Sequence, residues 1–177
     1  MTSNQARLTA LLSAIVAAAA LRLVPHPPNF SPIDAMALFS GAYLGRRAIA
    51  FVAPLAALLL SDAVLGFYHG VATVYATVAL IVVIGWWLSS RPTPLRIGAA
   101  AIASSVTFFV ITNFGMWLFS GFYPVTYAGL VACYTAAIPF FQNTVAGDLF
   151  YSVLLFGGFA LAQHLVPHLR GGETQPA

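Results

Sequence analysis

Residues 97–120, IGAAAIASSVTFFVITNFGMWLFS, run for 24 positions without a charged side chain. A helix crosses the hydrocarbon core of a bilayer with roughly 20 apolar residues, so this stretch predicts a transmembrane helix. The rest of the chain has the same character, because 60% of the 177 residues are hydrophobic and only 6% are charged. With a mean hydropathy of +0.91, the composition is that of a membrane protein and not of a soluble domain.

Breaks at proline, glycine and arginine divide the chain into further apolar segments. Because backbone groups have no other partners in lipid, we expect an all-α membrane bundle that forms one domain over residues 1–177. The six predicted transmembrane helices are residues 8–24, 32–44, 48–68, 71–90, 97–120 and 144–166. The second is short and ends at Arg46 and Arg47, so it is either a thin or tilted span or a half-inserted helix. Residues 127–141 are interrupted by Pro139 and predict an outer loop helix, not a seventh crossing.

The seven arginines indicate the orientation. With the N-terminus in the cytoplasm, six of them fall on the cytoplasmic side and only Arg22 falls outside, as the positive-inside rule requires. Both termini are then cytoplasmic. The basic pI of 9.4 is explained by these arginines on the cytoplasmic side. Nucleic-acid binding would instead need a basic face on a soluble domain.

The first span has a second interpretation. Arg7 followed by LTALLSAIVAAAAL is similar to a secretory signal peptide. Arg22 follows at once, without a clean small-x-small cleavage site, so we favour a retained helix.

Polar and aromatic residues embedded in apolar sequence gather on the outer side in this orientation. Small-molecule sites are usually apolar pockets with a few convergent polar groups. We therefore predict a ligand-binding site there, formed by Asn29, Asp34, Asp62, His69, Asn113, Trp117, Tyr123, Tyr134, Gln142, Asn143 and Asp148.

The three aspartates of this set differ in how well structure alone explains them. Asp62 is the most informative, because an ionisable group within a span usually faces a cavity or pathway; the alternative is a carboxylate bonded to hydroxyl groups of neighbouring helices. Asp34 follows Ser31 and Pro32, which read as an N-cap and a first helical position. Asp148 opens the last predicted span, where negative charge suits the helix dipole.

Catalytic and metal motifs are absent from the sequence. There is no HExxH or CxxC pattern, and the pair His164 and His168 is separated by Pro167 at the cytoplasmic end. Cys133 is the single cysteine, so no internal disulfide is possible. We expect no catalytic residue set, no metal and no cofactor.

Ala10, Ala14 and Ala18 recur every four residues on the first predicted helix. Such a stripe of small residues lets helices approach closely. It serves either packing within the bundle or the docking of a membrane protein partner.

Four strings carry a resemblance to a known family: HPPNFSPIDAMALFSGAYLG, PLAALLLSD, TNFGMWLFSGFYP and CYTAAIPFFQNTVAGDLFYS. They are similar to an uncharacterised family of small bacterial inner-membrane proteins, over roughly residues 22–160. This resemblance implies the bacterial inner membrane as the location and assigns no activity.

The architecture also resembles the substrate-binding S components of energy-coupling-factor vitamin transporters. Those proteins have six helices, a ligand pocket at the outer face, and an alanine stripe on the first helix that docks a partner. The resemblance implies the same docking role for Ala10, Ala14 and Ala18.

Three functions remain open on the sequence. The first is a small transporter or substrate-capture subunit that binds a small organic molecule at its outer face. The second is a structural or accessory subunit of a membrane complex. The third is an intramembrane enzyme that uses Asp62 and Asp148 as a carboxylate pair. In each case the lipid bilayer is a partner.

Overall fold

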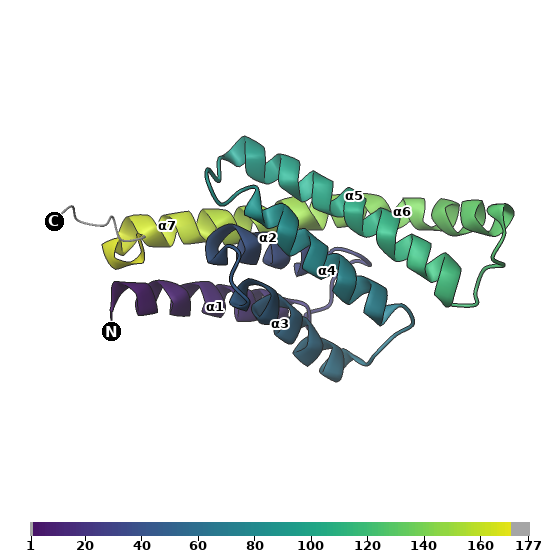
Figure 1. Cartoon of the computed structure of the whole chain (residues 1–177), viewed down its shortest axis with the longest axis horizontal. Coiled ribbons are helices and arrows are strands. Elements are labelled where there is room, and N and C mark those ends of the chain that lie inside the picture. The colour runs from purple at the N-terminus through teal and green to yellow at the C-terminus, as the bar shows by residue number, and fades with distance from the viewer. Residues whose placement is uncertain (1, 171–177) are drawn as a thin grey trace.

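The computed structural model describes residues 2–170, and throughout this range its regular elements are helices (Figure 1). The all-α fold predicted from composition is therefore confirmed. The beginning of α1 and the end of α7 lie at the same end of the bundle, and the α3–α4 and α5–α6 connections lie toward the other end (Figure 1). The elements are α1 (Ser3–Leu21), α2 (Ile33–Leu44), α3 (Ile49–Leu65), α4 (Val71–Trp86), α5 (Pro94–Phe119), α6 (Tyr127–Ser152), the π-helical segment η1 (Val153–Gly157), α7 (Gly158–Leu165) and the 3₁₀ turn η2 (Pro167–Leu169).

Within residues 2–170, three helical segments are long and apolar enough to cross a membrane, which is fewer than the six predicted. They are Ser3–Leu21, Pro94–Phe119 and the continuous segment Tyr127–Leu165. The other helices are apolar but shorter, at 12 residues for α2, 17 for α3 and 16 for α4. At 1.5 Å per residue α2 rises only about 18 Å, against a hydrocarbon core of about 30 Å.

Helix α2 is the central helix of the bundle. It contacts α1, α3, α4, α5 and α6, and every residue from Ile33 to Leu44 except Tyr43 is buried. A helix that is hydrophobic all round belongs in a core. Residues 33–44 thus form a buried core helix, and whether it is a thin or tilted span or a half-inserted helix stays a prediction.

The seam between α2 and α4 is made by two glycines. A Cβ atom added to Gly41 would overlap the carbonyl oxygen of Val82, and one added to Gly85 would overlap that of Leu38. The two helix backbones thus touch, as small residues permit. Gly45 follows α2 with a φ of +64°, a left-handed conformation that glycine adopts without strain, so it ends the helix and does not extend the seam.

The bundle buries acidic side chains within an apolar core and exposes large apolar side chains on its outside. Asp62 and Asp148 are at most 2% exposed, whereas Leu60, Val64 and Val153 are at least 70% exposed. Soluble proteins rarely expose contiguous apolar surface and almost never bury acidic groups. This distribution, with the long apolar helices, identifies a membrane protein.

Residues 127–165 form one continuous helical segment of 39 residues. The predicted division into a loop helix over 127–141 and a separate last span over 144–166 was wrong. Pro139 lies inside α6, although proline in a helix interior removes one backbone hydrogen bond and usually kinks or ends the helix. At 1.5 Å per residue the segment is about 58 Å long, so it exceeds the thickness of the hydrocarbon core.

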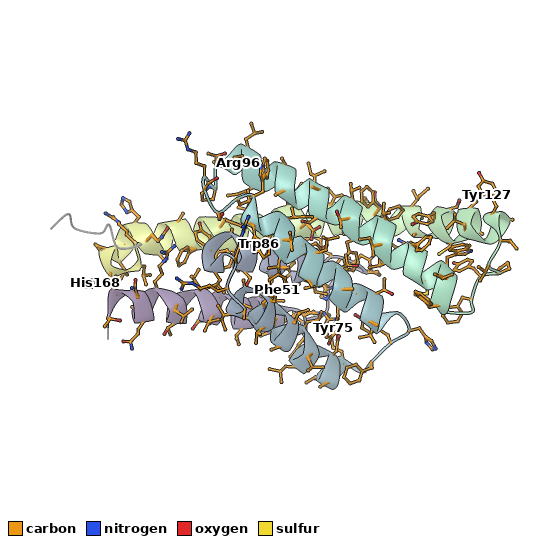
Figure 2. The ribbon with its side chains drawn as sticks, viewed as in Figure 1. Phe51, Tyr75, Trp86, Arg96, Tyr127 and His168 are labelled. Carbon is orange, nitrogen blue, oxygen red and sulfur yellow. The ribbon has the colours of Figure 1, made fainter. Side chains whose placement is uncertain are left out.

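Arginine and tryptophan side chains pair at the α2–α3 and α4–α5 connections, in the half of the molecule that holds both ends of the described chain. The guanidinium of Arg46 lies 5.5 Å from the ring centre of Trp86, and that of Arg96 lies 4.5 Å from the ring centre of Trp87. Figure 2 shows Trp86 and Arg96 in this region, with Tyr127 at the opposite end. Such cation–π pairs suit a membrane interface, where the rings face lipid and the charges reach water.

The alanine stripe of α1 packs toward the bundle. Ala18 is buried, and Ala10 and Ala14 are partly buried against the core. Helix α1 contacts α2 and α3 and is an integral part of the bundle. Docking of a partner protein on this stripe stays a prediction.

Candidate functional site

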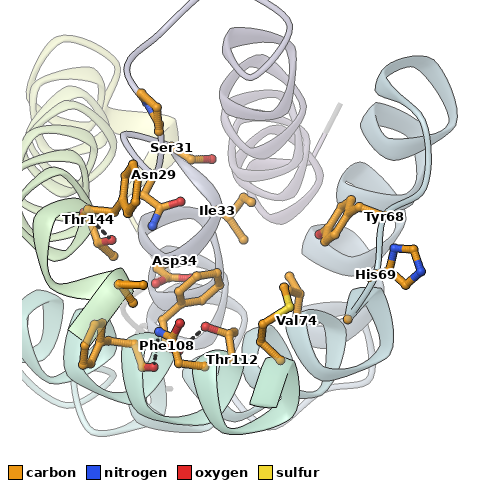
Figure 3. Close-up of a pocket in the computed structure, with 18 of the residues that line it drawn as sticks. Asn29, Ser31, Ile33, Asp34, Tyr68, His69, Val74, Phe108, Thr112 and Thr144 are labelled. Atoms are coloured by element: carbon orange, nitrogen blue, oxygen red, sulfur yellow. Dashed lines mark hydrogen bonds between the residues drawn. The ribbon is translucent and has the colours of Figure 1, made fainter. Parts of the chain in front are cut away.

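A cavity of about 570 Å³ lies in the bundle, and no residue of the arginine–tryptophan pairs lines it. Its walls come from the α1–α2 loop, the α3–α4 loop, the second half of α5 and the middle of α6. Figure 3 shows Asp34 among the lining residues, with Thr144 on one side and Tyr68 and His69 on the other. The lining residues are Arg22, His26, Pro28, Asn29, Ser31, Ile33, Asp34, Tyr68, His69, Gly70, Val74, Phe108, Phe109, Thr112, Asn113, Met116, Tyr123, Cys133, Ala136, Ala137, Phe140, Thr144 and Asp148.

The structure brings together part of the ligand-binding set predicted from the sequence. Six of its members line the cavity: Asn29, Asp34, His69, Asn113, Tyr123 and Asp148. Five do not line it: Asp62, Trp117, Tyr134, Gln142 and Asn143. That the lining residues bind a ligand stays a prediction.

Three of the non-lining residues hold the surrounding backbone in place. The indole Nε1 of Trp117 donates to the carbonyl of Pro124 at 3.0 Å, and the hydroxyl of Tyr134 donates to the carbonyl of Val110 at 2.6 Å. The amide of Asn143 donates to the carbonyl of Pro28 at 3.0 Å and ties the α1–α2 loop to α6. Gln142 is exposed.

Asp62 is neutralised by Arg22. The Nη1 atom of Arg22 lies 2.5 Å from Oδ1 of Asp62, and the hydroxyl of Tyr75 donates to Oδ2 at 3.0 Å. Arg22 also donates to the hydroxyl of Ser61. The carboxylate is fully buried and the arginine side chain is 11% exposed. The sequence held one indication of this pair. Arg22 was the single arginine on the outer side, an exception to the positive-inside rule that the burial of Asp62 now explains.

The second acidic centre joins Asp34 of α2 to Asp148 of α6. Both carboxyl groups are buried and line the same cavity, close enough for the charge on one to act on the other. The hydroxyl of Ser105 donates to Oδ2 of Asp148 at 2.5 Å. Asp148 therefore meets Asp34 and not Asp62, so the carboxylate pair suggested for an enzyme, Asp62 with Asp148, is replaced by a different one.

Helix capping does not explain these two aspartates, although Asp34 lies in the first turn of α2, where negative charge suits the helix dipole. Helix α2 begins at Ile33, and the side chain of Ser31 makes no capping hydrogen bond. Asp148 lies deep inside α6, far from a helix start. Neither residue is explained by helix capping, so both remain candidates for a role in the cavity.

Among the described residues, two buried polar atoms in the cavity wall have no hydrogen-bond partner. They are Oδ1 of Asp34, in a residue that is 3% exposed, and the hydroxyl oxygen of Ser31. Leaving a buried polar atom unsatisfied costs about 1–3 kcal/mol, and more for a charged group. Such atoms in a cavity wall are available to a bound molecule.

Two adjacent serines of α5 give a matched test of the acidic centre. Ser105→Ala removes the donor to Asp148 and is expected to lower the free energy of unfolding by about 1–3 kcal/mol. Ser104 is equally buried, and its hydroxyl has no partner, so Ser104→Ala is expected to be neutral or stabilising. Unfolding of both variants in mixed micelles, followed by circular dichroism, compares them; equal losses would contradict the assignment.

Comparison with known proteins places this chain in a family. The profile of a family of unknown function, DUF6580, matches residues 2–169.

The chain belongs to DUF6580. This confirms the resemblance to an uncharacterised family. No curated protein and no solved structure matches the chain, and no finding supports the likeness to vitamin-transporter S components. DUF6580 supplies no activity, so functional inference for this member rests on the cavity and its residues.

Proposed function

We propose that this protein is a small membrane transport protein or substrate-capture subunit that binds a small organic molecule from the outer face of the membrane. The observation that supports the proposal is the cavity. Its volume of about 570 Å³ falls within the range of about 300–1,000 Å³ that is usual for small-molecule sites.

The lining has the mixed chemistry of a binding site. Aromatic side chains supply flat apolar surface, and they are Tyr68, Phe108, Phe109, Tyr123 and Phe140. Acidic, amide and imidazole groups are interspersed among them. Such a lining holds the body of an organic molecule by apolar contact and orients it by a few polar contacts.

We further propose that the chain lies in the bacterial inner membrane, with the arginine–tryptophan pairs on the cytoplasmic side. In this arrangement the six helices α1 to α6 lie in the bilayer, with the short α2 enclosed by the others. The exposed apolar side chains of α3, α5 and α6 then face lipid. The first turns of the long α6 project beyond the hydrocarbon core on the outer side.

Native mass spectrometry of the protein, purified gently from its own membranes, tests the proposal. We expect a reproducible small-molecule adduct that is lost or at least tenfold weaker in Asn113→Ala, which removes an amide from the cavity wall. The matched control is Gln142→Ala, an exposed amide outside the cavity, which should keep the adduct. Protein without an adduct that copurifies in fixed ratio with other membrane subunits would overturn the proposal and indicate an accessory subunit.

A further inference from the structure

The Asp34–Asp148 centre combines two acidic groups with an open acceptor. Both residues line the cavity, and both are at most 3% exposed. Oδ1 of Asp34 is buried without a partner. A hydrogen-bond donor or cation that binds against Asp34 would supply the missing partner.

Within residues 2–170, no arginine is paired with this centre. Of the described arginines, Arg22 alone lines the cavity, and its guanidinium is already bound to Asp62 and Ser61. Around the cavity the other titratable side chains are His26, Tyr68, His69, Tyr123 and Cys133. Within the described residues the ion pair of Arg22 with Asp62 stands alone, so the second acidic centre lacks a counter-ion from the chain.

Two neighbouring carboxylates do not both ionise easily in a buried site, because like charges repel strongly where water does not screen them. The pair is therefore stable with one shared proton and one net negative charge. From these acidic groups and the aromatic lining, we propose that the cavity binds an organic cation. The Asp34–Asp148 pair is its counter-ion and gives up the shared proton as the cation binds. This inference rests on the proposed function and names its ligand class.

The exchange balances in charge and atoms. The O–H bond of the shared proton breaks and the proton leaves to water. The ammonium N–H groups of the ligand then donate to the two carboxylates. The centre and its occupant carry one net negative charge before and after, so the exchange places no additional charge in the buried site. The aromatic walls, including Phe108 and Tyr68, also favour a cation, because ring faces attract positive charge.

Tryptamine is a suitable probe, since it joins an ammonium group to an aromatic body small enough for the cavity. Indole-3-acetate and 3-methylindole are its anionic and neutral counterparts. Isothermal titration calorimetry on the full chain in nanodiscs, with empty nanodiscs subtracted, measures all three. We expect tryptamine alone to bind, with an affinity that rises up to tenfold per pH unit where one proton is exchanged. Repeating the titration in buffers of different ionisation enthalpy should give one proton released per ligand.

Two substitutions separate the acidic pair from the rest of the cavity. Asp34→Asn and Asp148→Asn keep the side-chain shape and imitate the proton-loaded pair, and we expect each to weaken tryptamine at least tenfold and to remove the pH dependence. His69→Gln removes an imidazole from the cavity wall and should retain the pH dependence. Because the proton count is measured on the unmodified protein, the test holds even if a variant fails to fold.

The outcomes distinguish this inference from the proposed function. Binding of indole-3-acetate or 3-methylindole without tryptamine, an affinity for tryptamine independent of pH, or no binding of tryptamine would each overturn the cation assignment. If native mass spectrometry still finds an adduct that is neutral or anionic, the proposed function stands and only the ligand class is wrong. Absence of any adduct overturns the proposed function itself.

Discussion

Arg22→Met is expected to lower the free energy of unfolding by about 3–5 kcal/mol, because it leaves a buried carboxylate without its counter-ion. Asp62 is fully buried, and its other partners, such as the hydroxyl of Tyr75, supply hydrogen bonds but no charge. Methionine fills most of the volume of the arginine stem, so lost packing contributes little to the effect.

The double variant Arg22→Met with Asp62→Leu distinguishes an unpaired charge from a lost contact. Removing both charges of a buried pair is often neutral or stabilising, so the double variant should recover most of the stability lost in the single one. Denaturant unfolding in mixed micelles, arranged as a double-mutant cycle, gives the coupling energy. A double variant as unstable as the sum of the two single variants would contradict the ion pair.

The second large effect is expected at the seam between α2 and α4. Gly41→Ala should cost about 3 kcal/mol or more, because the new methyl group would overlap the carbonyl oxygen of Val82 and overpacking forces backbones apart. A backbone carbonyl within a helix cannot move aside as a flexible side chain does.

Gly98→Ala is the matched control for this substitution. Gly98 also lies within a helix, but a Cβ atom there meets nothing within 4 Å. Alanine is favoured over glycine in helix interiors by about 1 kcal/mol, so the control should be stabilising. Thermal unfolding in detergent compares the two, and a similar change in both variants would contradict the close approach of α2 and α4.

The sequence was sufficient for features that depend on composition and local pattern. The charge-free run over 97–120 predicted α5 (Pro94–Phe119), and the aspartates embedded in apolar sequence pointed to buried polar centres. Helix α2 was harder to interpret, because a short apolar helix has the same sequence character whether it faces lipid or other helices on every side. Its surroundings depend on how the other helices close around it.

The partners of the acidic residues could not be predicted from the sequence for a related reason. Asp34 meets Asp148 across 114 sequence positions, and Asp62 meets Arg22 across 40. Both contacts depend on the order of the helices around the bundle, which a single sequence does not record. The position of Asp148 was further obscured by Pro139, which indicated a break in a helix that continues through it.

The π-helical segment η1 (Val153–Gly157) also sets where the chain tolerates a change in length. A π-helical turn holds one residue more than an α-helical turn. Beyond it, Phe159 packs against Phe39 and Tyr43 of α2, with ring centres 5.7 and 4.8 Å apart. Loss of one residue within η1 would restore an ordinary α-helical turn and keep Phe159 facing α2, whereas loss of one residue from α6 between Asp148 and η1 would rotate Asp148 relative to the aromatic cluster by about 100°. Among relatives of this chain, single-residue length differences in the last helix should therefore fall at η1.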